Sequence, residues 1–253
     1  MINAPRDREG SARFHPAPPR AADPFDGVLL VDKAGGPTSH DIVDLVRRHF
    51  GLKKVGHGGT LDPQATGLLV LLIGRGTKLS ESFMTSDKVY EGAMHLGVTT
   101  DTQDGEGAVT READWTGVTK EAVEEQFAAM VGDLMQTPPM VSAAKVGGTP
   151  LYKLARKGKT VERKPKLIHI FEFRMIGFDP PLVNFMLRCS KGTYVRTICA
   201  DIGENLGCGA HLAQLRRLKS GKLAVEDAVP QNDLGTMSRE ELLERIIPIR
   251  EFL

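Results

Sequence analysis

The feature that most constrains the fold is a glycine-rich segment, VGHGGTLDPQAT at residues 55–66, joined directly to an apolar run, GLLVLLI at residues 67–73. Glycine, proline and polar residues at this density predict a loop. The apolar run is short and rich in bulky side chains, which is typical of a strand rather than a helix. The two together predict that a loop carrying one histidine and one aspartate is held against the start of a strand.

The rest of the chain predicts a few helices among mostly extended segments. Residues 27–31 form a short apolar strand, and Ser39 can cap a following helix that runs to Phe50 and stops at Gly51. Thr119 caps a second helix to about Val131, and a last one runs from 238 to about 246. Further candidate strands cover 89–96, 168–176 and 183–189. This order is α+β and not alternating β-α-β.

Composition sets the size and the class of the protein. With 253 residues, 41% hydrophobic and 26% charged, the chain can form one large domain or two small ones. Residues 1–25 are rich in Pro, Ala, Arg and Asp and predict a flexible leader, which leaves 26–253 as the folded catalytic part. No apolar run reaches about 18 residues and no secretion signal is visible, so a cytoplasmic protein is expected. The three cysteines lack C-x-x-C spacing, so we expect neither a disulfide framework nor a zinc site.

Asp62 is the candidate reactive group of the glycine-rich loop. Glycines allow a ligand to approach the backbone, and Pro63 biases Asp62 toward an extended conformation that presents its carboxylate outward. On spacing alone, a turn without a catalytic role is the more common explanation of such a segment. The segment lacks the glycine patterns of nucleotide-binding loops, so no nucleotide cofactor is expected.

The loop sequence GHGGTLDPQATGLL resembles the catalytic motif of the TruB family of pseudouridine synthases. The resemblance extends over about residues 26–230 in six ordered segments, and too many match in order for chance to explain them. The other five are KAGGPTS at 33–39, KVYEG at 88–92, QTPPMVSAAK at 136–145, LYKLARKG at 151–158 and GTYVRT at 192–197. The resemblance implies the pseudouridine synthase fold, which is a mixed and largely antiparallel sheet with flanking helices and a central catalytic cleft.

The same resemblance assigns roles to single residues. It implies that Asp62 is the catalytic aspartate, that Tyr90 stacks on the target base, and that Arg196 pairs with Asp62. Chemically, a guanidinium can hold a carboxylate ionised, and a phenol offers a ring face for a flipped base. If residues 192–197 are extended, Tyr194 shares a face with Arg196 and forms a second wall of the base pocket. His57 matches a histidine used for RNA binding and base extrusion, which does not require it to titrate.

A local basic segment is the expected RNA contact, because the net charge of the whole chain is only +1. Residues 151–174 hold eight Lys and Arg side chains against two Glu, a local net charge of +6. They overlap a segment at about 136–160 that resembles the RNA-gripping insertion of the family. Arg216 and Arg217 are candidates to extend this patch. The substrate-binding residues expected besides His57 and Tyr194 are Lys33, Gly59, Lys145, Lys153, Lys157 and Lys159.

The resemblance implies isomerisation of uridine-55 in the T-arm of tRNA, by base flipping and without cofactor or metal. Asp62 attacks C1′ or C6, or removes the C2′ proton; the sequence leaves these three open. A monomer without an obligatory protein partner or membrane contact is expected, and no separate C-terminal RNA-binding module follows Val229. The rival hypotheses are a guide-RNA-dependent synthase acting on ribosomal RNA, which would need partner proteins, and an RNA chaperone for tRNA folding. Ala34, where the family usually has proline, is a departure that touches no catalytic group.

Overall fold

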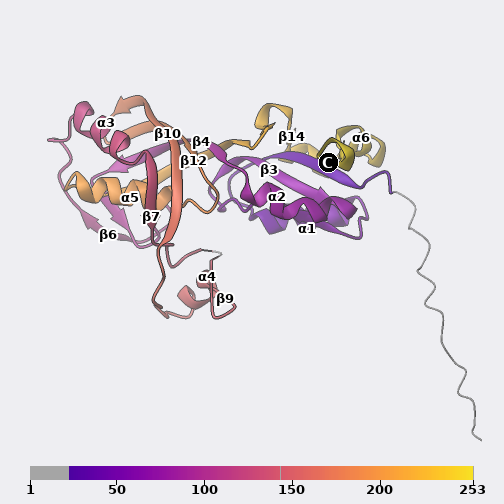
Figure 1. Cartoon of the computed structure of the whole chain (residues 1–253), viewed down its shortest axis with the longest axis horizontal. Coiled ribbons are helices and arrows are strands. Elements are labelled where there is room, and N and C mark those ends of the chain that lie inside the picture. The colour runs from indigo at the N-terminus through magenta and orange to yellow at the C-terminus, as the bar shows by residue number, and fades with distance from the viewer. Residues whose placement is uncertain (1–22, 143, 253) are drawn as a thin grey trace, which may run out of the picture.

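The computed structural model describes residues 23–142 and 144–252. Residues 1–22 of the expected leader lie outside this range. The fold is α+β, as predicted, with a mixed and mostly antiparallel sheet that runs through the length of the molecule (Figure 1). The folded part begins before the predicted position 26, because Phe25 is already buried and its ring contacts the guanidinium of Arg239 at 4.4 Å.

Eleven strands of the described part form the main sheet, whose central path is β14-β1-β3-β12-β4-β11-β10-β7. Outside this path, β2 pairs with β3, β13 pairs with β12, and β15 pairs with β1. The pairs β1–β14 and β3–β12 are parallel, and the others are antiparallel. Two hairpins, β5–β6 and β8–β9, stand apart from it. The strands are β1 Gly27–Lys33, β2 Val55–His57, β3 Thr66–Ile73, β4 Lys88–Leu96, β5 Val98–Thr100, β6 Val109–Glu112, β7 Gly132–Gln136, β8 Lys145–Val146, β9 Thr149–Pro150, β10 Lys166–Asp179, β11 Leu182–Cys189, β12 Ala210–Ser220, β13 Leu223–Ala224, β14 Val229–Pro230 and β15 Ile247–Pro248.

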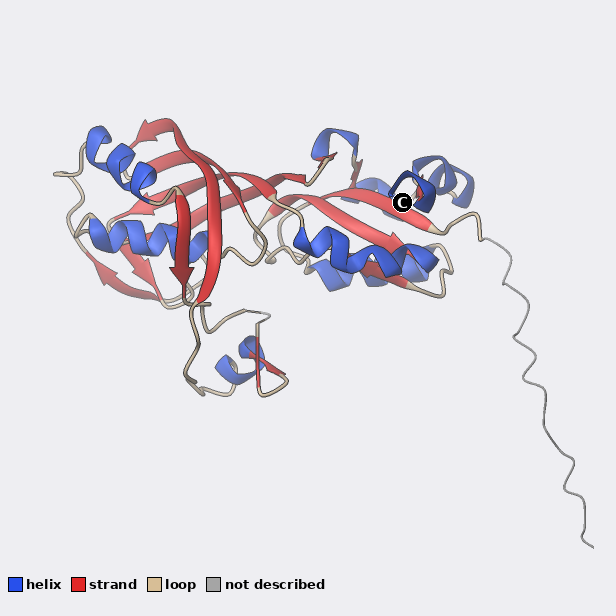
Figure 2. Cartoon of the chain, viewed as in Figure 1, coloured by secondary structure: helices blue, strands red, loops and turns tan. Residues whose placement is uncertain are grey.

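The helices cover the two halves of the sheet separately (Figure 2). They are α1 Ser39–His49, α2 Ser80–Thr85, α3 Lys120–Ala129, α4 Leu151–Ala155, α5 Val195–Asn205 and α6 Arg239–Arg245. Helices α3 and α5 lie in one half, and α1, α2 and α6 lie in the other. Helix α4 and the β8–β9 hairpin belong to a segment that projects from the sheet between β7 and β10.

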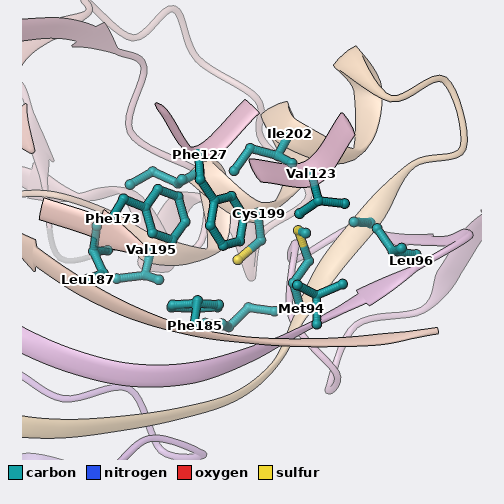
Figure 3. Close-up of a cluster of buried hydrophobic side chains, with 14 of the residues drawn as sticks. Met94, Leu96, Val123, Phe127, Phe173, Phe185, Leu187, Val195, Cys199 and Ile202 are labelled. Atoms are coloured by element: carbon teal, nitrogen blue, oxygen red, sulfur yellow. The ribbon is translucent and has the colours of Figure 1, made fainter. Parts of the chain in front are cut away.

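Each half of the sheet has its own core. In the α3–α5 half, Phe127 stacks on Phe173 at 4.0 Å between ring centroids, and Phe185 meets both rings edge-on (Figure 3). In the other half both faces of β3 are covered, because Leu69 and Leu71 pack in the cluster of α1 and α6 whereas Leu68 and Leu72 pack with Phe83 of α2. Burial on both faces explains the uninterrupted apolar run of β3.

The junction of the halves is where β3 meets β12. The two strands pair only over Thr66–Gly67 and Arg216–Arg217. Gly67 has a φ of +94°, and a Cβ there would collide with the backbone of Arg217, so only glycine allows this close approach. Tyr90 and Leu215 contact the apolar clusters of both halves. The loop that carries Asp62 ends at this junction.

The sequence predicts caps at Ser39 and Thr119 and a last helix that starts at residue 238. Thr119 and Ser238 cap α3 and α6, but α1 is capped by Thr38 and not by Ser39. The Thr38 side chain accepts a hydrogen bond from the backbone N–H of Asp41, whose carboxylate accepts in turn from Thr38. This capping box leaves Ser39 free to turn inward, where it is buried.

Candidate active site

The loop around Asp62 is held by side chains from elsewhere in the chain. Ser39 Oγ accepts a hydrogen bond from Leu61 N at 2.8 Å and donates to Leu61 O at 3.0 Å. The Lys33 ammonium, which has no exposed surface, donates to the carbonyls of Ala34, Pro63 and Ala65 at 2.8–2.9 Å. The backbone on both sides of Asp62 is therefore fixed before any ligand binds.

This burial corrects the expectation that Lys33 contacts the substrate. Its three ammonium hydrogens have three carbonyl partners, so none is left for a phosphate. Burial lowers the pKa of Lys33 to about 8, and the nearby charge of Asp62 acts in the opposite direction. Lys33 holds the loop of Asp62 in place.

Arg217 makes a third attachment, from β12. Its guanidinium donates to Leu68 O at 2.7 Å and to Gly59 O and Thr60 O at 3.2 Å. The side chain is only 2% exposed, so Arg217 does not belong to the surface patch that the sequence suggested. Arg216 lies at the surface instead, in a two-pronged ion pair with Asp32. The alternation of side chains along a strand places these neighbours on opposite faces.

Arg196 contacts two carboxylates. Its Nη2 lies 3.0 Å from Asp62 Oδ2, and its Nη1 lies 3.3 Å from Asp104 Oδ2. The arginine is 4% exposed, whereas the side chain of Asp62 is 47% exposed. One guanidinium thus joins the Asp62 loop to the loop that carries Asp104. Asp104 was not among the residues expected from the sequence.

The Asp62 carboxylate lines a cleft and is accessible from it. Desolvation by the surrounding protein raises the pKa of Asp62, and the charge of Arg196 is the main influence that lowers it. Asp104 and Glu106 oppose Arg196, and Lys33 adds to it. A carboxylate that is partly desolvated and held by one arginine is a stronger base and nucleophile than one in water.

Tyr90 and His57 occupy different surroundings, because His57 lines the cleft and Tyr90 packs against the two apolar clusters. Tyr90, on β4, is partly buried at the junction of the two cores, and burial raises its pKa to about 12, so the phenol stays protonated at neutral pH. The charge of Asp62 also raises this pKa, whereas the nearby charge of Arg217 lowers it. His57 ends β2 and lines the cleft, and its pKa is lowered mainly by burial, so the ring is neutral at pH 7.

Tyr194 is not on a strand, which corrects the expectation for residues 192–197. It is the residue before α5, and Arg196 lies in the first turn of that helix. The period-two argument for a shared face therefore fails. The Tyr194 backbone is held by Gln136, whose side-chain amide donates to Tyr194 O at 3.0 Å and accepts from Tyr194 N at 2.8 Å.

The cleft of about 990 Å³ runs between the Asp62 loop and the projecting segment at 137–165. Asp62, Thr60 and His57 line one side, and Tyr152, Arg156 and Lys159 line the other. Gly59 has a φ of +148° and turns its carbonyl to Arg217. The remaining lysines expected to bind substrate are exposed on the projecting segment: Lys145, Lys153 and Lys157.

Residues 23–142 and 144–252 contain no group of three or more His, Cys, Asp or Glu side chains placed to hold a metal ion. They also contain no helix of sufficient length and hydropathy to cross a membrane.

Comparison with known proteins decides the family. Residues 47–195 match the family model described as TruB family pseudouridylate synthase, N-terminal domain. Residues 196–253 match the one described as tRNA pseudouridylate synthase B C-terminal domain. This chain belongs to the TruB family. The boundary between the two matches falls in the first turn of α5, so the family's C-terminal part supplies Arg196 and the central strand β12.

Individual relatives of this TruB family member agree with that assignment. The chain is 49% identical over 229 residues to tRNA pseudouridine synthase B of Syntrophotalea carbinolica, covering 90% of this chain and 75% of that protein. It is 48% identical to the protein of the same name from Opitutus terrae, covering 89% and 93%. A chain in the crystal structure of a Cbf5-Nop10-Gar1 complex is similar with a TM-score of 0.71 and 25% identity, covering 90% of this chain and 61% of that one.

Proposed function

We propose that this TruB family member converts uridine-55 in the T-arm of tRNA into pseudouridine, with Asp62 as the catalytic residue. The observation that carries the proposal is the contact of 3.0 Å between Arg196 and Asp62, which lines a cleft whose other side is formed by a basic segment. Pseudouridine synthesis in tRNA is the activity in the names of two relatives that are 49% and 48% identical to this chain over the aligned residues.

The reaction needs an ionised carboxylate and a confined base. The C1′–N1 bond of the uridine breaks, the base turns, a C1′–C5 bond forms, N1 gains a proton and C5 loses one. Atoms and electrons balance without a redox partner, so no cofactor is required. Asp62 supplies the carboxylate, Arg196 keeps it ionised and aimed, and the loop contacts of Lys33 and Arg217 prevent it from moving.

The remaining residues act on binding. Extruding a loop nucleotide costs less than extruding a stacked duplex base, which favours a T-loop as substrate. We assign neutral His57 to the space that the flipped nucleotide leaves, and Tyr90 and Tyr194 to the walls around the base. Gly59 permits close approach of the RNA backbone, and Lys145, Lys153, Lys157 and Lys159 bind phosphates. We expect a monomer to suffice.

The test is Asp62→Asn, which preserves size and hydrogen-bonding shape but removes the charge. Purified enzyme in excess is mixed with a T-arm hairpin, and pseudouridine is read by chemical derivatisation. We expect tight RNA binding and no detectable product, with full activity in the control Asp114→Asn at an exposed site remote from the cleft. Product formation within a few-fold of wild type would remove Asp62 from the mechanism.

The same assay separates the rival functions. A guide-dependent enzyme would leave the isolated hairpin unmodified until guide RNA and partner proteins were added. An RNA chaperone would accelerate tRNA folding but form no pseudouridine. Turnover of the bare hairpin by the isolated chain is the result expected here.

A further inference from the structure

Gln136 occupies an unusual position between the projecting segment and the pocket. It is the last residue of β7, it is 6% exposed, and its amide makes both hydrogen bonds to the backbone of Tyr194. The two residues are 58 positions apart. The side chain thus reproduces the exchange of N–H and C=O bonds that two neighbouring strand residues make.

The backbone of Tyr194 sets the start of α5. Tyr194 O also accepts hydrogen bonds from Thr197 N and Ile198 N, which are the first bonds of the helix. The Tyr194 side chain makes no capping hydrogen bond to α5. Arg196 lies within that first turn, 3.0 Å from Asp62. A displacement of the Tyr194 backbone therefore moves the guanidinium that orients the reactive carboxylate.

Gln136 also lies where the projecting segment joins the sheet. It pairs with Lys166, the first residue of β10, so both ends of the segment at 137–165 meet at this pair. The segment lines the cleft opposite Asp62. RNA held by the segment is thus connected to Tyr194 through one buried amide.

We infer that Gln136 is a positioning residue that holds Tyr194 and the first turn of α5, and thereby Arg196, in register with Asp62. The inference rests on the proposed function, since it concerns the geometry of that reaction. Gln136 does not line the cleft, and both hydrogen bonds of its side chain go to Tyr194, so it acts through Tyr194.

The test compares Gln136→Met and Gln136→Glu with Thr119→Ala. Methionine keeps the length of the side chain and removes both hydrogen bonds, whereas glutamate still accepts from Tyr194 N. Thr119→Ala removes the cap of α3, a hydrogen bond between side chain and backbone away from the cleft. It controls for a general loss of stability.

For Gln136→Met we expect the single-turnover rate at saturating T-arm RNA to fall about tenfold or more, with the dissociation constant for RNA within about threefold of wild type. Looser contact with Arg196 raises the pKa of Asp62, so the acidic limb of the rate profile should move to higher pH. The other charged groups facing Asp62 are Lys33, Asp104 and Glu106, which all three variants retain. Gln136→Glu should recover part of the rate.

A Gln136→Met rate within twofold of Thr119→Ala, with an unmoved acidic limb, would overturn the inference. If Gln136→Met does not fold, Gln136→Glu decides alone, because a rate equal to wild type would show that the donated bond is not needed. Wild-type protein assayed in parallel separates the two proposals. An inactive wild type contradicts the proposed function, whereas an active wild type with an equally active Gln136→Met contradicts only the role of Gln136.

Discussion

Replacing Arg217 by methionine is the sharpest test of how the Asp62 loop is held. Methionine fills much of the same volume but has no donor. The change leaves the carbonyls of Gly59, Thr60 and Leu68 without the partner they have in the native protein. Neighbouring Arg216 supplies a matched control, because Arg216→Met removes the same chemical group from the surface.

The magnitudes follow from burial. Leaving a buried acceptor without its donor costs about 1–3 kcal/mol, and Arg217, which is 2% exposed, donates to three carbonyls. Because the variant no longer buries a cation, which offsets part of this loss, we expect a net destabilisation of about 3–5 kcal/mol. The ion pair of Arg216 with Asp32 is 39% and 30% exposed, and such surface pairs contribute about 0–1 kcal/mol. For a domain of this size 1 kcal/mol changes Tm by about 2–4 °C, so Arg217→Met should lower Tm by roughly 6–20 °C and Arg216→Met by at most about 4 °C.

Thermal unfolding followed by circular dichroism, together with urea unfolding, measures both variants under identical conditions. The urea midpoint should fall in Arg217→Met at an unchanged m-value, since the folded state buries the same surface. Equal Tm values for the two variants would refute the reasoning. They would show that the free energy needed to desolvate the Arg217 guanidinium equals the stabilisation from its three hydrogen bonds.

Three further outcomes are expected. Because desolvation raises the pKa of Asp62 and the ionised form reacts, the single-turnover rate should fall with acid at a midpoint above the ordinary aspartate value of 3.8; a midpoint at or below 3.8 in a rate–pH profile would contradict this. A carboxyl group with a raised pKa in the folded state destabilises the fold once it is ionised. Asp62→Asn should therefore have a Tm at pH 7 no lower than that of wild type, and any increase in Tm should vanish below pH 3.8, which calorimetry can measure. Charge reversal of Lys157 and Lys159 should weaken tRNA binding and flatten its dependence on salt while leaving the single-turnover rate at saturating RNA nearly intact; a collapse of that rate would mean that the segment does more than grip.

Local pattern predicted most of the elements. The caps Thr119 and Ser238 and the apolar run of β3 depend on neighbours within a few residues, so they could be read directly from the sequence. The cap of α1 was misplaced by one residue because Thr38 and Ser39 are both good caps, and burial of Ser39 against Leu61 decides between them. Tyr194 was misplaced for a similar reason, since Gly192 and Thr193 suit the start of a strand as well as the approach to a helix.

The candidate site was predictable only in part. The glycine-rich pattern predicted the loop that carries Asp62, whereas the catalytic role of Asp62 and its pairing with Arg196 were predicted from the family resemblance and not from spacing. Asp104 gave no signal, because an aspartate in a polar loop is usually a turn residue. Its role depends on a contact with Arg196 across 92 positions.

The sequence by itself determined where most strands and helices form, that Asp62 lies in a glycine-rich loop and which family the chain resembles, because these depend on short-range pattern and on ordered motifs. Only the tertiary structure decided what the cations do. As cations, Lys33 and Arg217 are candidates to bind RNA, but the structure buries both of them against the loop of Asp62. Arg196 joins that loop to the loop of Asp104. The physical reason is that a buried charge is tolerated only where its partners converge, and that convergence exists only once β12 and α5 have packed beside the loop of Asp62.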